Sequence, residues 1–297
     1  MRVSANGVRI EVDLRGPPDG EPLLLIMGLG MQLVAWPDGF VDELVARGFR
    51  VIRFDNRDVG LSQSFDHLGL PNIALAALLH TLRLPIRPPY TLADLACDAV
   101  GVLDALGIAR AHVCGASMGG MVAQHLGFAH GQRLKSLTLM MTTSGHRSLP
   151  KESLKVRRLL LSRPRPGATP EQRQHNIVDH FMRLYGVIGS PGFPTEPHAL
   201  RERIALSVRR AYRPQAAARQ LVAIAADSHR AVRLPHIQAP TLVLHGADDA
   251  LIPVAAAHDL ARRIPGAKLD IIPGWGHDLP EPLWPRLADA IAARAAE

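Results

Sequence analysis

The chain has 297 residues, of which 47% are hydrophobic and 21% are charged, and its formal net charge is +7. This length and hydrophobicity are sufficient for a large buried core, which excludes a disordered chain. No N-terminal stretch combines a basic start with a continuous apolar run, and no apolar run is long enough to span a membrane. The two cysteines, Cys97 and Cys114, fall in a predicted helix and a predicted buried strand, as reduced core thiols do. We therefore expect a soluble cytoplasmic protein with no membrane partner.

The positive charge is concentrated in one part of the chain. Residues 151–233 carry sixteen Lys/Arg and six Asp/Glu, a net charge of +10, so the rest of the chain carries about −3. This segment lacks interleaved aromatic residues and any known nucleic-acid motif, so we expect no nucleic-acid partner. Solvated helix faces are the favoured explanation of these charges, and recognition of an anionic or carboxylate-bearing substrate is the alternative.

Short β-branched or leucine-rich runs alternate with helical patterns along the chain. This alternation predicts an α/β protein with a mostly parallel eight-stranded sheet and helices on both faces. The expected strands are 1–4, 8–14, 23–27, 50–54, 111–116, 134–141, 242–245 and 269–272. Between them, Thr91 and Asp94 form a capping-box-like helix start, and Gly107 is expected to end that helix.

One long region interrupts the alternation. Residues 146–234 are helical in pattern, rich in arginine and broken by several prolines. We predict that they form a helical cap, or lid, inserted into a core domain of residues 1–145 and 235–297. Within the cap, the Pro/Gly-rich loop 189–194 is expected to act as a hinge or to line a pocket. A shorter insertion, residues 66–90, carries an apolar stretch that is a further candidate for the pocket wall.

The predicted strand 111–116 leads directly into Ser117. The surrounding sequence Gly115-Ala116-Ser117-Met118-Gly119 has the form G-x-S-x-G and precedes a predicted helix. This pattern between a strand and a helix is typical of a nucleophile elbow, in which a sharp turn exposes a serine hydroxyl. Small flanking residues are needed because larger side chains would collide with the neighbouring strand and helix. We predict that Ser117 is a nucleophile; a glycine-rich turn with an incidental serine is the alternative.

A serine hydroxyl is a poor nucleophile near neutral pH, so Ser117 needs a base and an acid that orients the base. In this type of fold both partners follow later strands, and the acid precedes the histidine in the chain. His277 lies in Gly274-Trp275-Gly276-His277, directly after the last predicted strand, and is the candidate base. Three other histidines fall in a predicted helix or in predicted strands, where packing roles are favoured: His258, His112 and His245.

The loop after strand 242–245 contains two aspartates, which cannot both point at one imidazole. Asp249 fits the spacing G-x-x-D-x-x-x-P counted from Gly246, whereas Asp248 is one residue early and is expected to face the other way. The loop after the preceding core strand contains no acid, which removes the other usual placement. We therefore predict that Asp249 orients His277.

An oxyanion intermediate needs two backbone N–H donors. Met118, directly after the serine, is expected to supply one, and Leu29, between Gly28 and Gly30, the other. The polar loop 55–62 is interpreted as structural, with direct substrate contact as the alternative. No His/Cys/Asp cluster has the spacing of metal ligands, so we expect neither a metal nor another cofactor.

These segments together resemble the α/β-hydrolase superfamily over nearly the whole chain. The resemblance runs through residues 27–30, 53–62, the serine turn, 246–253 and 274–277. Residues 25–28 with 36–38, and 111–113 followed by the Gly-x-Ser-Met-Gly turn, are most similar to the aclacinomycin methylesterase branch, whose substrate is a methyl ester on a polyketide. The resemblance implies the α/β-hydrolase fold. It also implies Ser117 as nucleophile, His277 as base and Asp249 as orienting acid, with Leu29 and Met118 as oxyanion donors.

The resemblance implies a serine hydrolase that cleaves a small-molecule carboxylic ester through an acyl-enzyme, without a cofactor, and leaves homo-oligomerisation open. Serine at position 117 disfavours relatives with an aspartate nucleophile, and Met118 disfavours proline iminopeptidases, which usually have tryptophan there. Cofactor-free haloperoxidases with perhydrolase activity, lactonases and carbon–carbon bond hydrolases share the triad and remain alternatives, as does a non-enzymatic ligand-binding relative. The cap and the 66–90 insertion do not closely follow the methylesterase, so its anthracycline substrate is not transferred.

Overall fold

The computed structural model describes every residue of the chain, 1–297. An eight-stranded sheet with the order β1-β2-β4-β3-β5-β6-β7-β8 forms its centre. Its strands are β1 (Arg2–Ala5), β2 (Val8–Arg15), β3 (Glu21–Ile26), β4 (Phe49–Phe54), β5 (Ala111–Ala116), β6 (Leu134–Met140), β7 (Thr241–Gly246) and β8 (Lys268–Ile272). Strand β2 is antiparallel to β1 and β4, and all other neighbours are parallel. All eight predicted strands are therefore confirmed, and the largest shift is the start of β3 at Glu21 rather than Leu23.

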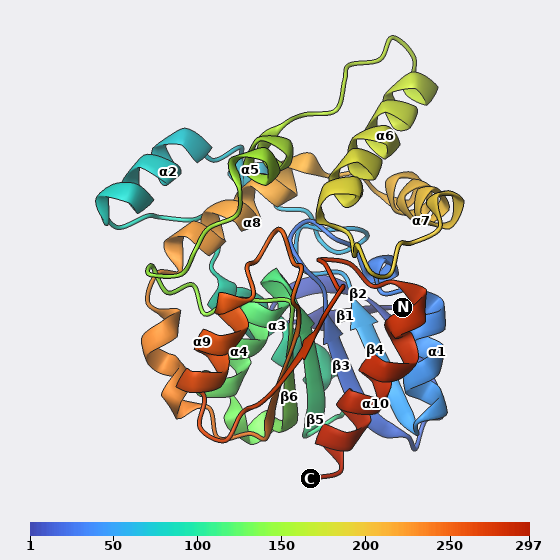
Figure 1. Ribbon diagram of the computed structural model, residues 1–297, viewed down its shortest axis with the longest axis vertical. Helices are drawn as coiled ribbons and strands as arrows, with labels where there is room; N and C mark the ends of the chain where they lie inside the picture. Colours follow the sequence, from blue (N-terminus) through green and yellow to red (C-terminus); the bar gives the residue numbers. More distant parts are fainter.

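Helices cover both faces of the sheet (Figure 1). On one face lie α3 (Leu92–Ala105), α4 (Met118–Ala129) and α9 (Ala255–Arg263), and on the other lie α1 (Asp38–Ala46) and α10 (Trp284–Ala295). The predicted capping box starts α3, because the Asp94 N–H donates to Thr91 Oγ1 and the Thr91 N–H donates to the Asp94 carboxylate. Gly107 follows this helix with φ of +68°.

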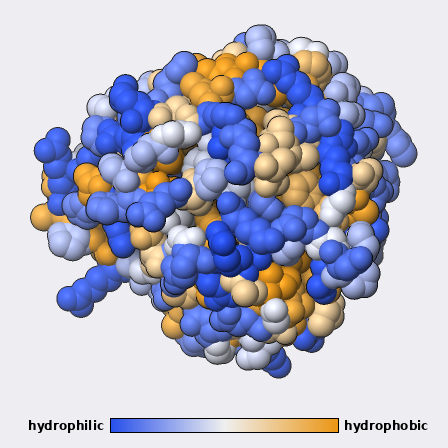
Figure 2. Space-filling model, turned by 90° about the horizontal axis from the view of Figure 1, so that it is seen from below, coloured by the Kyte–Doolittle hydropathy of each residue, from blue (hydrophilic) through white to orange (hydrophobic).

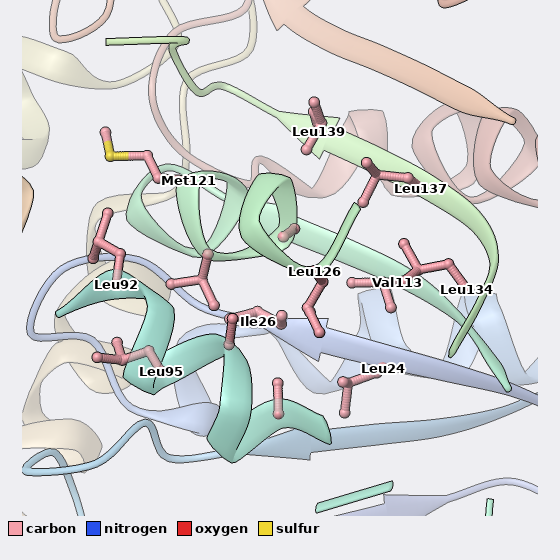
Figure 3. Packing of buried hydrophobic residues seen from close by; sticks show 14 of the residues in the cluster. Leu24, Ile26, Leu92, Leu95, Val113, Met121, Leu126, Leu134, Leu137 and Leu139 are labelled. Carbon is pink, nitrogen blue, oxygen red and sulfur yellow. The ribbon is translucent and has the colours of Figure 1, made fainter. Parts of the chain in front are cut away.

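The larger of two buried hydrophobic clusters lies between the sheet, α3 and α4. Figure 3 labels members of this cluster, among them Leu24 and Ile26 of β3, Val113 of β5, and Met121 and Leu126 of α4, and it shows Leu126 beside Val113 and Ile26. None of these five side chains is more than 7% exposed. Their burial contributes on the order of 25 cal/mol for each Å² of apolar surface removed from water. This packing fixes α4, and with it the turn that leads into it, against the sheet.

A long helical segment connects β6 to β7. It contains α5 (Leu154–Leu161), α6 (Pro170–Ile188), α7 (Pro197–Arg210) and α8 (Pro214–Ala226), and the 3-10 helix η4 (Arg230–His236) follows. We call residues 146–234 the inserted segment. Its helices α5 to α8 lie above the sheet in Figure 1, and α2 (Ile73–Leu82), from the shorter insertion, packs on α8.

Buried ion pairs attach the inserted segment to the rest of the chain. The guanidinium of the fully buried Arg219 contacts the two carboxylate oxygens of Asp58 at 2.5 and 2.9 Å. Arg210 contacts the fully buried Asp55 at 2.6 Å. Both aspartates belong to the loop 55–62 after β4. That loop therefore has a structural role, which agrees with the structural interpretation of residues 55–62.

No helix of the structure combines the length and the apolarity that crossing a bilayer requires. Figure 2 shows the end of the molecule opposite the inserted segment. There, hydrophobic areas are separated by hydrophilic side chains, and no single apolar area covers this end.

Candidate active site

The turn between β5 and α4 holds Ser117 in a strained backbone conformation. Its φ is +56° and its ψ is −121°, which a residue with a side chain adopts at a cost of about 1–3 kcal/mol when its surroundings enforce it. Two hydrogen bonds enforce it here. The Ser117 N–H donates to the Met140 carbonyl at 3.0 Å, and the Thr142 hydroxyl donates to the Ser117 carbonyl at 2.6 Å. The Ser117 side chain is partly exposed and its hydroxyl makes no hydrogen bond to the protein.

The glycines that flank Ser117 are sterically required. A Cβ atom on Gly119 would lie 2.0 Å from the Ile26 carbonyl oxygen, and one on Gly115 would lie 2.3 Å from the Gly119 carbonyl oxygen. Neither distance leaves room for any side chain. The prediction that only small residues fit this turn is confirmed.

The loops after β7 and β8 bring Asp249 and His277 together. His277 Nδ1 lies 2.7 Å from Asp249 Oδ2, and both side chains are buried. The second carboxylate oxygen of Asp249 accepts the N–H groups of Leu251 and Ile252 at 2.9 and 2.8 Å. Asp248 faces away, and its carboxylate accepts the Gly274 N–H at 2.8 Å. The structure therefore places Asp249, and not Asp248, beside His277.

The surroundings of Asp249 favour its ionised form. Burial alone would raise the pKa of this carboxyl, but the charge of His277 and the hydrogen bond from it lower the pKa below its usual range. An ionised carboxylate only accepts hydrogen bonds, so Nδ1 of His277 carries a hydrogen. In the neutral imidazole Nε2 is then an acceptor. The Asp249 contact therefore leaves Nε2 as the nitrogen of His277 that can accept a hydrogen.

A second buried histidine lies near the same carboxylate without competing for it. His245 Nε2 is 3.5 Å from Asp249 and makes its shorter contact, 2.8 Å, with the Ile252 carbonyl. Burial lowers the pKa of His245, which favours its neutral form. Its place in β7 agrees with the packing role expected from the sequence.

The loop that carries His277 is held by part of the inserted segment. We call residues 188–195 the contact loop. The His277 N–H donates to the Ile188 carbonyl at 2.7 Å, and the Gly276 N–H donates to Ser190 Oγ at 2.9 Å. The Ser190 hydroxyl in turn donates to the carboxylate of Asp278. The Pro/Gly pattern indicates the loop 189–194, whereas no sequence signal distinguishes Ser190 or Asp278, although Asp278 is the direct neighbour of His277.

The backbone amides of Leu29 and Met118 are available as donors. Met118 is the first residue of α4, so its N–H has no acceptor within the helix, and the Leu29 N–H makes no hydrogen bond to the protein. The adjacent Gly30 N–H donates to Gln220 Oε1 of α8 at 2.8 Å, which holds this loop in place. The loop lies directly against the serine, since a Cβ atom on Gly28 would be 3.1 Å from Ser117 Cβ.

The three side chains of the expected triad occupy one edge of the sheet. Ser117, Asp249 and His277 follow β5, β7 and β8, whose carboxyl ends lie at the same edge because these strands are parallel. A hydrogen bond joins Asp249 to His277, whereas none joins His277 to Ser117. No group of three or more His, Cys, Asp and Glu side chains is arranged to hold a metal ion.

Comparison with known proteins gives matches over nearly the whole chain. Residues 21–281 match the family model of the alpha/beta hydrolase fold. A rhodomycin D methylesterase of Streptomyces sp. (strain C5) is 31% identical over 295 residues, which cover 94% of this chain and 92% of that protein. This match agrees with the methylesterase branch that the sequence motifs indicate.

Two solved structures share the fold at lower identity. An enol-lactonase from Burkholderia xenovorans LB400 superimposes with a TM-score of 0.71 and 22% identity, and the match covers 100% of both chains. A meta-cleavage product hydrolase from Pseudomonas fluorescens IP01 gives a TM-score of 0.73 and 17% identity, covering 99% of this chain and 96% of that one. At this identity the likeness concerns the fold alone.

Proposed function

Because the chain belongs to the α/β-hydrolase family, we propose that it is a serine hydrolase that cleaves a small-molecule carboxylic ester through an acyl-enzyme. In this proposal Ser117 is the nucleophile, His277 the base and Asp249 the acid that orients the base. The observation that carries it is the 2.7 Å contact of Asp249 with His277, at the sheet edge where Ser117 stands in its strained turn. A neutral histidine oriented by a buried carboxylate is what a serine nucleophile requires.

The proposed reaction begins when His277 Nε2 takes the Ser117 proton as the hydroxyl oxygen attacks the ester carbonyl. The imidazolium that forms is stabilised by the ionised Asp249 carboxylate. His277 then gives the proton to the departing alcohol, which leaves the acyl group on Ser117. Water, deprotonated by the same histidine, then attacks the acyl-enzyme, and as the carboxylic acid leaves, His277 returns the proton to Ser117 Oγ. The absent hydrogen bond between Ser117 and His277 is compatible with this role, since such bonds are often long in unliganded enzymes.

The oxyanion of the tetrahedral intermediate is proposed to bind between the Leu29 and Met118 amides. Both N–H groups are free, and they come from the two loops that meet at Ser117. Donors fixed before the reaction stabilise developing charge without reorganisation, and each is worth about 3 kcal/mol in comparable enzymes. Gln220 supports this arrangement by holding the amide next to Leu29.

We further propose that residues 146–234 act as a cap on a core domain of residues 1–145 and 235–297. The contacts of Ser190 with the His277 loop and of Gln220 with the Leu29 loop support this division. The cap would then border the site from above and contribute to substrate choice. Specificity would accordingly lie in the part of the chain that sequence motifs describe least.

An ester is favoured over the other substrates because the methylesterase relative has 31% identity over 94% of this chain. Lactone hydrolysis, perhydrolysis and carbon–carbon bond cleavage use the same side chains. The lactonase and meta-cleavage hydrolase structures, at 22% and 17% identity, support only the shared fold. Assays with short acyl esters, lactones, vinylogous diketones, and peroxide with a carboxylic acid separate these activities.

The decisive experiment compares Ser117→Ala with Ser148→Ala, an exposed serine outside the site. With p-nitrophenyl acetate, Ser117→Ala is expected to lower kcat by about four to six orders of magnitude, whereas Ser148→Ala retains activity. A fluorophosphonate is expected to label the wild-type protein and Ser148→Ala but not Ser117→Ala. Esterase activity that survives in folded Ser117→Ala would disprove the assignment.

A further inference from the structure

Exposed leucines are concentrated in two segments of the chain. Fourteen large hydrophobic side chains are exposed, and nine of them are leucines within residues 68–87 and 147–165. These are Leu68, Leu70, Leu75, Leu78, Leu82, Leu84, Leu154, Leu160 and Leu161. Single exposed apolar residues are normal on proteins, but a concentration of this kind marks an interaction surface.

Helix α2 packs on α8 with one side and exposes an apolar face on another. Ala76 is its one buried residue, and His80 Nδ1 lies 3.0 Å from the Ala225 carbonyl of α8. Leu75, Leu78 and Leu82 are separated by three and four positions and therefore share one helix face. They are 50%, 54% and 57% exposed. The helix contains no Asp, Glu, Lys or Arg that would explain its place on the surface.

The same two segments carry an unusual positive charge. Residues 68–87 and 147–165 contain nine Lys/Arg and one acid, Glu152, a net charge of +8 that exceeds the +7 of the whole chain. Only Arg157 forms an ion pair, with Glu152. The other eight basic side chains are exposed and unpaired. In α5, Lys155 and Arg158 are interspersed with exposed leucines, a composition typical of helices that lie on a membrane surface.

The two segments project from the same end of the molecule. In Figure 1, α2 and α5 both lie at the end formed by the inserted segment, away from the sheet. The segments that carry the exposed leucines and the unpaired positive charges thus lie at the same end of the molecule.

We propose that residues 68–87 and 147–165 form a docking surface for an anionic lipid bilayer. The leucines enter the boundary between headgroups and acyl chains, and the lysines and arginines contact lipid phosphates. Each basic side chain near such a surface adds to the attraction. No apolar run of the sequence is long enough to span a bilayer, which by itself predicts no membrane partner. A helix that lies on the surface needs no such run.

A second copy of this chain fits the surface less well. In a symmetric dimer the same patch faces itself, which would bring two sets of unpaired basic side chains together. A bilayer containing phosphatidylglycerol supplies negative charge and an apolar layer at once. Charge complementarity therefore favours the lipid surface over self-association.

Vesicle flotation of the full-length protein tests the proposal. We expect it to bind vesicles of phosphatidylglycerol and phosphatidylcholine in equal parts, to bind phosphatidylcholine alone weakly, and to be released by added salt. The pair Lys155→Glu with Arg158→Glu is expected to weaken binding by about tenfold or more. The pair Leu75→Ser with Leu78→Ser is expected to do the same, by about tenfold. Val232→Ser, at an exposed apolar residue outside both segments, is the matched control and retains binding.

Thermal unfolding and light scattering of every variant complete the test. Because Lys155 and Arg158 are exposed, we expect the variant with both charges reversed to fold. It therefore still tests the proposal if the leucine pair does not fold. The proposal is overturned if the wild-type protein does not bind anionic vesicles at low salt. It is also overturned if both variant pairs bind these vesicles as strongly as the control does. If the protein does not bind vesicles but forms a dimer that dissociates on these substitutions, the surface belongs to a second copy of the chain. That result would also overturn the proposal. Because no outcome depends on ester hydrolysis, the test is independent of the proposed function.

Discussion

The Ser190 hydroxyl donates a hydrogen bond to the carboxylate of Asp278, the residue directly after His277. The same hydroxyl accepts the N–H of Gly276, directly before His277, at 2.9 Å. One side chain of the inserted segment therefore contacts both neighbours of the proposed base. The His277 N–H donates to the carbonyl of Ile188, which belongs to the same contact loop as Ser190. The position of the imidazole is thus coupled to the inserted segment.

Ser190→Ala is expected to lower kcat by roughly tenfold to a hundredfold with little change in KM, because a displaced base loses its alignment with the serine. Thr195→Val is the graded control, since the Thr195 hydroxyl reaches Asp278 only at 3.4 Å, and it is expected to have a smaller effect. Steady-state kinetics and the rate of fluorophosphonate labelling measure both. Equal effects of the two substitutions, or a change confined to KM, would argue against a positioning role for Ser190.

Asp278 gives the same contact a pH dependence. Burial raises the pKa of its carboxyl above the usual range, against the hydrogen bonds from Ser190 and Thr195 that lower it. The folded protein therefore holds this proton more tightly than the unfolded chain does. The stability linked to this group is complete below the unfolded pKa of about 3.9 and is lost as the pH rises through the folded pKa.

Asp278→Asn removes this titration. We expect the free energy of unfolding of the variant to improve relative to wild type as the pH rises from below about 3.9, the unfolded pKa, through the raised folded pKa. Urea unfolding at several pH values measures the difference. Two curves that stay parallel across this range would show that the folded-state pKa of Asp278 is not raised.

The two neighbouring aspartates are expected to respond very differently to amide substitution. Asp249→Asn removes the charge that favours a hydrogen on His277 Nδ1, so kcat is expected to fall by about 10⁴-fold. Asp248→Asn keeps an oxygen that accepts the Gly274 N–H and is expected to leave kcat within about tenfold of wild type. Ester hydrolysis at neutral pH measures both variants. Comparable losses in the two would contradict the assignment of Asp249.

Much of this arrangement could be predicted because its signals are local. Each strand is a short apolar run bounded by turn residues, and Ser117, Asp249 and His277 each follow such a run directly. The spacing from Gly246 was enough to favour Asp249 over its neighbour, since a shift of one residue turns a side chain the other way. Local spacing is therefore enough to predict the strands of the sheet and the side chains that follow them at its edge.

The contacts of the inserted segment could not be predicted because they join residues far apart in the chain. Ser190 contacts Asp278 and Gln220 contacts Gly30, pairs separated by 88 and 190 positions. No spacing rule connects such partners, since tertiary packing alone brings them together. The same reason applies to α2, whose apolar sequence indicates burial while Leu75 and Leu78 are half exposed.

Two glycines test the steric account of the serine turn. Gly119→Ala places a Cβ atom 2.0 Å from the Ile26 carbonyl oxygen, in a place where neither backbone can move freely. We expect the free energy of unfolding to fall by about 2–4 kcal/mol and esterase activity to be lost with the altered turn.

Gly186→Ala is the matched control, because its Cβ atom meets nothing within 4 Å on the exposed face of α6. It is expected to stabilise that helix by about 0.5–1 kcal/mol, since alanine loses less backbone entropy than glycine. Denaturant unfolding measures both variants, and a Gly119→Ala protein as stable and active as Gly186→Ala would refute the requirement for glycine at the turn.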